Sequence, residues 1–115
     1  MSEWYADGSG WNGTQCGWAI IFPDGSTHVD MSSKEALTNN ECEYKAVLCA
    51  AYSALSGDTI YTDSQLVVKQ VSGEYKCKVQ HLQRLLKETV QILSQKNLLL
   101  KWVPRKQNKA GKIFE

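Results

Sequence analysis

Short stretches in which apolar and polar residues alternate open the chain and predict three β-strands. The candidates are residues 3–8, 16–22 and 26–31. Alternation with a period of two residues is typical of a strand that buries one of its faces. A glycine-rich loop over residues 8–14 separates the first two candidates, and the turn Pro23-Asp24-Gly25 separates the second from the third. The pattern therefore predicts an antiparallel meander.

After the meander, helical spacing of apolar residues alternates with two short strand patterns. Thr38 or Asn39 is a candidate N-cap for a helix that runs to about Leu55. The further predicted elements are a strand over 59–62, helices over 65–71 and 80–93, a strand over 98–103 and a helical stub at the end. Strands separated by helices pair in parallel. We therefore expect an α/β fold, with a mixed five-stranded sheet (the antiparallel meander plus two parallel strands) flanked by helices.

The composition is that of an ordinary globular protein and excludes several classes. The 115 residues are 43% hydrophobic and 22% charged, which predicts a single domain over residues 1–115. No apolar run approaches the ~20 residues needed to span a bilayer, and no signal peptide is apparent. We therefore expect no membrane partner and a cytoplasmic location. The four cysteines lack zinc-type spacing, so a structural metal site is not expected.

The net charge of +1 conceals a difference between the two halves of the chain. Acidic side chains outnumber basic ones in residues 1–63, and basic ones dominate residues 64–115. An acidic region can hold cations, whereas a basic region can contact phosphates. Two solvated helical faces that happen to differ would give the same imbalance, so charge alone does not decide the function.

Three carboxylates stand at predicted element edges that are far apart in the sequence. Asp7 lies on the first predicted strand and Glu43 near the start of the first predicted helix. Asp63 lies at the carboxyl end of the fourth strand, where open α/β sheets place their sites. Carboxylate oxygens suit Mg²⁺ or Mn²⁺, and two such ions can activate water for phosphodiester cleavage.

Four segments together resemble the type 1 ribonucleases H, especially their short archaeal-like and bacterial forms. Three of these segments are similar to the three carboxylate motifs of that family and occur in the same order. They are Tyr5-Ala6-Asp7-Gly8-Ser9, Asn39-Asn40-Glu41-Cys42-Glu43-Tyr44 and Thr62-Asp63-Ser64-Gln65. The fourth segment, Trp102-Val103-Pro104-Arg105 through Asn108, is similar to the last-strand segment of the family. The resemblance implies a ribonuclease H-like fold. It also implies cleavage of the RNA strand of an RNA–DNA hybrid with two Mg²⁺ or Mn²⁺ ions, leaving a 3′-hydroxyl and a 5′-phosphate.

The resemblance also assigns roles to individual residues. The implied metal ligands are Asp7, Glu43 and Asp63. The implied substrate-binding residues are Gly8, Ser9, Asn12, Asn39, Asn40, Gln65 and Arg105. Asn40 and Gln65 would meet bases or 2′-hydroxyl groups in the minor groove, by which a protein tells RNA from DNA. Asn39 would do the same or cap the helix, and Gly8 would let the RNA approach closely. Larger family members carry a histidine in the loop before Asn108, and here Arg105 would serve the leaving phosphate instead.

The fourth corner of the implied site departs from the family pattern. The family usually carries another aspartate a few residues after the asparagine that Asn108 resembles, and here Gly111 or Lys112 stands in its place. Asn108 can offer an amide oxygen, giving an Asp-Glu-Asp-Asn set of catalytic residues, and the alternatives are Glu115 or water. The departure keeps a second hypothesis open, a non-catalytic or very weakly active nucleic-acid-binding module. In either case we expect a monomer.

Overall fold

Five strands form one mixed sheet in the order β3-β2-β1-β4-β5. The computed structural model describes residues 1–10, 12–33 and 36–114. The strands are β1 (Glu3–Ser9), β2 (Cys16–Ile21), β3 (Thr27–Ser33), β4 (Thr59–Thr62) and β5 (Leu99–Trp102). The first three pair antiparallel, whereas β4 lies parallel to both β1 and β5. The predicted mixed sheet is confirmed, with a third strand that ends later than residue 31.

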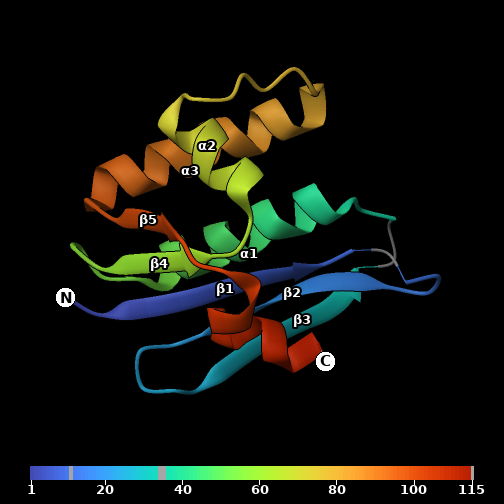
Figure 1. Cartoon of the computed structure of the whole chain (residues 1–115), viewed down its shortest axis with the longest axis horizontal. Helices are drawn as coiled ribbons and strands as arrows, with labels where there is room; N and C mark the ends of the chain where they lie inside the picture. Colours follow the sequence, from blue (N-terminus) through green and yellow to red (C-terminus); the bar gives the residue numbers. More distant parts are fainter. Residues whose placement is uncertain (11, 34–35, 115) are drawn as a thin grey trace.

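Helices cover this sheet unequally (Figure 1). They are α1 (Asn39–Ser53), α2 (Gln65–Ser72) and α3 (Gln80–Lys96), followed by the 3₁₀ segments η1 (Arg105–Gln107) and η2 (Lys109–Phe114). The third helix runs three residues beyond the predicted end at residue 93, and Asn97 ends it in a left-handed conformation. The predicted helical stub consists of the two 3₁₀ segments. None of the helices among the described residues is long and apolar enough to cross a membrane.

Opposite faces of β1 meet different elements. Successive side chains of a strand point to opposite faces, so Ala6 and Gly8 share one face and Asp7 lies on the other. A Cβ atom at Gly8 would touch the backbone of α1, and a Cβ atom at Gly111 in η2 would lie 3.4 Å from an Asp7 carboxylate oxygen. The C-terminal segment, red in Figure 1, accordingly crosses the face of the sheet opposite α1.

Small side chains bring α1 close to the sheet. Ala46, Ala50 and Ala51 of α1 are fully buried, as is Ala6 of β1. Larger buried side chains complete the core, among them Tyr44, Val47, Ile20, Ile60 and Val67. Because an alanine side chain ends at Cβ, the helix and strand backbones approach closely. This proximity brings the first turns of α1 to the end of β1.

Lys96 of α3 completes the other end of α1. The last turn of α1 contains no basic residue, and its final carbonyl groups lack intrahelical partners. The Lys96 ammonium group donates to the carbonyls of Ala51, Tyr52 and Ala54 at 2.9, 2.8 and 2.9 Å. A positive charge at the C-terminal end of a helix also interacts favourably with the helix dipole. Lys96 therefore joins α3 to α1.

Asp58 anchors the start of the parallel pair β1–β4. Its side chain is buried, and its carboxylate accepts hydrogen bonds from the Trp4 indole and the Ser2 amide at 2.9 Å and from the Leu55 amide at 3.0 Å. The Trp4 bond, with the two amide bonds, lowers the pKa of the Asp58 carboxyl, although burial acts in the opposite direction. The ionised form is therefore the one the fold stabilises.

We predict that Asp58→Asn lowers the free energy of unfolding by about 1–3 kcal/mol near neutral pH, because the amide cannot accept all of these bonds. A lowered folded-state pKa contributes stability that is complete above the unfolded value of about 3.9 and is lost as the pH falls through the folded value. Urea unfolding between pH 3 and 7 should therefore show the two proteins converging in acid. Asp24→Asn is the control, because that carboxylate is exposed and accepts hydrogen bonds from Ser26 within its own turn. An equal loss at all pH values would contradict this account.

Candidate active site

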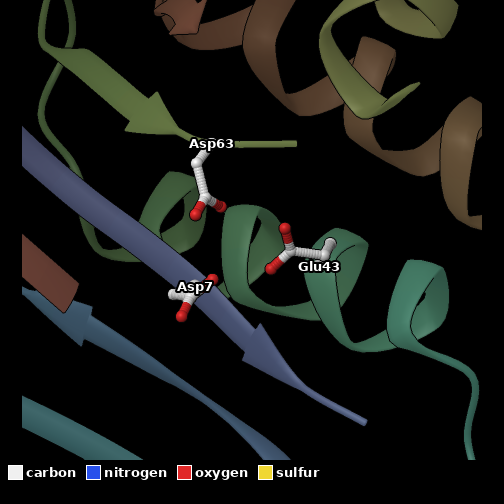
Figure 2. A group of neighbouring side chains, drawn as sticks. All are labelled: Asp7, Glu43 and Asp63. Atoms are coloured by element: carbon white, nitrogen blue, oxygen red, sulfur yellow. The ribbon is translucent and has the colours of Figure 1, made fainter. Parts of the chain in front are cut away.

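Three carboxylates from distant segments meet at one end of the sheet. Asp7 comes from β1, Glu43 from α1, and Asp63 directly follows β4. Each side chain offers a carboxylate oxygen, and these oxygens all lie within 4.8 Å of one another. Figure 2 shows the three carboxyl groups turned toward a common space. The predicted meeting of the three side chains is therefore present in the structure.

Gly8 sets the position of Glu43. A Cβ atom at Gly8 would lie 2.4 Å from the Cys42 carbonyl carbon and 2.5 Å from the Glu43 nitrogen, distances that real side chains do not adopt. The absent side chain thus lets β1 touch the backbone of α1. At this contact the Gly8 amide donates a hydrogen bond to the Glu43 carboxylate. The Glu43 side chain is thereby directed past the end of β1 toward Asp7.

Asp63 lies between a strand end and a helix cap. The side chain of the preceding residue, Thr62, is fully buried, and its hydroxyl accepts a hydrogen bond from the Ser64 amide at 3.2 Å. The Ser64 hydroxyl in turn accepts from the Val67 amide at 3.2 Å and caps α2. These two bonds order the backbone on both sides of Asp63.

Burial and neighbouring negative charge destabilise the ionised forms of Asp7 and Glu43. Burial is the main cause that raises the pKa of Glu43, and the negative charge of Asp7 adds to it. Burial also raises the pKa of Asp7, followed by the charge of Asp63, whereas the Arg105 guanidinium acts in the opposite direction. Buried carboxylates crowded in this way are stabilised in the ionised form by a nearby cation. With its hard oxygen donors, the group fits a divalent metal such as Mg²⁺ or Mn²⁺.

A pocket of about 440 Å³ surrounds these carboxylates. Its lining residues are Asp7, Gly8, Ser9, Gly10, Asn39, Asn40, Glu43, Asp63, Ser64, Arg105 and Phe114. The structure therefore brings Gly8, Ser9, Asn39, Asn40 and Arg105, five of the predicted substrate contacts, to the carboxylates. It does not bring the other two there. Gln65 is exposed outside the lining, and the Asn12 amide oxygen accepts hydrogen bonds from Thr14 and Gln15 within its own loop.

Three lining residues have no role predicted from the sequence, namely Gly10, Ser64 and Phe114. Ser64 lies within the third carboxylate motif and caps α2 in the structure. Phe114 belongs to η2, which reaches the pocket by crossing the sheet. No sequence pattern marks Phe114, because its place in the pocket depends on how the C-terminal segment packs.

Asn108 occupies a different environment from the predicted one. Its side chain is fully buried, its amide nitrogen donates to the Ala6 carbonyl at 2.9 Å, and its amide oxygen accepts from the Ala110 amide at 3.1 Å. Both ends of the amide are thus engaged with backbone groups. This arrangement supports a role in fastening the C-terminal segment to β1, and it gives the predicted metal-ligand role no support. Glu115, the alternative carboxylate, lies outside the described residues.

The comparisons with known proteins define the family. The RNase H family model matches residues 1–111, and the chain belongs to this family. A bifunctional protein of Mycobacterium tuberculosis, Rv2228c, is 33% identical over 98 residues. That match covers 78% of this chain and 27% of the relative, so the chain spans about a quarter of the length of the curated relatives it matches.

Solved structures of this family have the same fold. The N-terminal RNase H domain of Rv2228c, solved as a maltose-binding-protein fusion, is 31% identical with a TM-score of 0.70, over 92% of this chain and 84% of that one. RNase H1 of the archaeon Halobacterium salinarum NRC-1 is 26% identical with a TM-score of 0.76, over 96% and 91%. LC11-RNase H1, solved with an RNA/DNA hybrid, is 23% identical with a TM-score of 0.75, over 98% and 99%, and supports the fold alone.

We predict that Gly8→Ala separates β1 from α1, because the added methyl group meets backbone atoms that cannot move aside. The expected cost is about 1–3 kcal/mol of stability, together with weaker Mn²⁺ binding because Glu43 is displaced. Thermal unfolding and titration calorimetry measure the two effects. Gly111→Ala is the matched control, since its methyl group would make only a van der Waals contact, at 3.4 Å, with an Asp7 carboxylate oxygen. Equal losses in both variants would count against this role for Gly8.

Asn108→Ala is expected to lower stability by about 2–4 kcal/mol, because it leaves buried backbone groups without partners. Asn108→Asp separates the two possible roles. A carboxylate facing the Ala6 carbonyl cannot donate, so the fastening role predicts a lower Tm and no gain in Mn²⁺ affinity. Tighter Mn²⁺ binding by Asn108→Asp, at an unchanged Tm, would instead support the metal-ligand role.

Proposed function

We propose that the protein is an endoribonuclease that cleaves the RNA strand of RNA–DNA hybrids, leaving a 3′-hydroxyl and a 5′-phosphate. The observation that carries this proposal is the meeting of Asp7, Glu43 and Asp63 within 4.8 Å, in a pocket lined by amide groups, in a chain of the RNase H family. In the solved complex of LC11-RNase H1, this fold binds an RNA/DNA hybrid.

Asp7, Glu43 and Asp63 would hold two Mg²⁺ or Mn²⁺ ions. When bound, such ions supply an activated water and stabilise the leaving oxygen of a phosphodiester. The protein contributes the arrangement of the three oxygen donors, which the Gly8 amide fixes at Glu43 and the Thr62–Ser64 bond fixes at Asp63. Preorganised donors of this kind need little rearrangement when the substrate arrives.

The rest of the pocket suits an RNA strand. Asn39 and Asn40 line the wall beside Glu43, where their amide groups would meet the 2′-hydroxyls and base edges. Gly8 and Gly10 line the same pocket, and the missing side chains let their backbone pack directly against α1 and Asn39. Arg105 adds a positive charge at the pocket that would attract a phosphate. The predicted cytoplasmic location and monomeric state stay predictions.

A non-catalytic nucleic-acid-binding module is the second candidate. Gly111 favours it, because the C-terminal segment places no carboxylate beside Asp7 at this position. A site with three carboxylates instead of four holds cations less strongly. The three carboxylates that remain argue for catalysis, since a binding surface for anionic phosphates gains nothing from buried negative charge.

The decisive assay uses a labelled RNA–DNA hybrid with Mg²⁺ or Mn²⁺. We expect cleavage by the unsubstituted protein and a fall of at least about 100-fold in kcat for Asp63→Asn, because even residues that only support metal ligands are worth about 10–100-fold. Asp24→Asn, at an exposed turn, is the control and should cleave normally.

Each other outcome of this assay has a defined reading. Binding of the hybrid without cleavage in either metal supports the binding module. Cleavage of duplex DNA but not of the hybrid contradicts the proposed substrate. Full activity in Asp63→Asn removes Asp63 from the metal site.

A further inference from the structure

Trp102 makes a contact at the site that the carboxylate motifs do not account for. It is the last residue of β5, and its indole Nε1 donates a hydrogen bond to the backbone carbonyl of Asp63 at 3.1 Å. The neighbouring residue takes part as well, because the Val103 amide donates to the Thr62 carbonyl at 2.9 Å. The end of β5 therefore donates hydrogen bonds to the carbonyl groups of both Thr62 and Asp63.

The large exposed fraction of the Trp102 side chain indicates that packing alone does not explain a tryptophan at this position. Its side chain is 42% exposed although it is one of the largest apolar groups in the chain. A tryptophan confined to packing buries more of its surface than this. The indole offers a single hydrogen-bond donor and no acceptor. Here that donor binds the backbone carbonyl of Asp63. Phenylalanine or tyrosine could supply an aromatic ring at this position, but not a ring N–H.

The strand register explains why this residue reaches Asp63. Thr62 pairs with Trp102 in the parallel β4–β5 ladder, and regular pairing stops there because both strands end. Asp63 lies one residue beyond, where no ladder hydrogen bond is available to its carbonyl. The indole supplies a side-chain donor to this carbonyl where the strand pairing supplies no backbone amide. Without it, the hydrogen bonds of Thr62 and Ser64 would still hold the flanking residues, but the Asp63 carbonyl would lose its indole donor.

We infer that Trp102 is a positioning residue, whose indole N–H fixes the Asp63 peptide so that the Asp63 carboxylate faces Asp7 and Glu43. This inference rests on the proposed function, in which Asp63 is a metal ligand. Trp102 touches neither the substrate nor the metal in this role. It acts only through Asp63.

Trp102→Phe tests the inference, since it keeps an aromatic ring and removes the donor. We expect the Mn²⁺ dissociation constant of the hybrid-free protein to rise about 3- to 10-fold, the loss that corresponds to one hydrogen bond. With the hybrid, kcat should fall while KM stays the same. Tyr52→Phe is the matched control, because it also removes one hydrogen bond from an exposed aromatic residue, to Glu88 at 2.8 Å, at the far end of α1.

A second measurement needs no substitution. Trp4 donates its indole N–H to Asp58, far along β1 from the site, and serves as an internal reference in a ¹⁵N-labelled sample. The Trp102 indole resonance should exchange slowly with solvent and shift on addition of Mg²⁺, whereas the Trp4 resonance should not shift. A rapidly exchanging Trp102 indole that ignores Mg²⁺ would overturn the inference even if Trp102→Phe failed to fold.

The two proposals fail in distinguishable ways. Hybrid cleavage with unchanged Mn²⁺ affinity in Trp102→Phe overturns the role of Trp102 and leaves the proposed function intact. Weaker Mn²⁺ binding in Trp102→Phe, in a protein that cleaves no hybrid, supports Trp102 and overturns the function. Unchanged Mn²⁺ binding in Asp63→Asn overturns the inference as well, because Trp102 acts only through that residue.

Discussion

The close contact between Gly8 of β1 and the first turns of α1 is the constraint on which the site depends. The two backbones meet where a single added carbon would clash with both Cys42 and Glu43. Fully buried alanines in the second half of α1 allow the helix to pack closely on the sheet there as well. Since the Gly8 amide also binds the Glu43 carboxylate, the same contact that packs the core aims a charged side chain at Asp7. Core packing and site geometry are therefore one property of this fold.

The carboxylate cluster opposes folding, and other parts of the chain offset it. Burial and mutual repulsion raise the pKa values of Asp7 and Glu43, which means that their ionised forms are less stable in the folded protein than in water. Contacts at the opposite end of the sheet act in the other direction. Lys96 caps α1 with three hydrogen bonds, and Asp58 accepts three more. The molecule thus separates an end held by hydrogen bonds from an end where buried carboxylates repel one another.

Sequence patterns were sufficient for the sheet and for the three carboxylates, for identifiable reasons. Alternating and helical periodicities define the elements locally, and parallel strands end at a common edge, so Asp63 had to lie near β1. The contacts of Asn108 could not be predicted in this way. An amide can ligate a cation or bridge two backbone groups with equal ease, and only the packing of the C-terminal segment decides between them. The same holds for Trp102 and Phe114, whose contacts form across the sheet and not along the chain.

The open corner at Gly111 explains why positioning matters so much here. In this structure the C-terminal segment meets the site with Gly111, which has no side chain, so no further carboxylate there helps to hold cations. In the proposed metal site, cation affinity would then come from the geometry of the three carboxylates that remain. A small rotation of one carboxylate removes a third of the donors instead of a quarter. The hydrogen bonds of Gly8 to Glu43 and of Trp102 to the Asp63 peptide act against such rotations. A three-carboxylate site therefore relies more heavily on the backbone contacts around it than a site with a fourth ligand would.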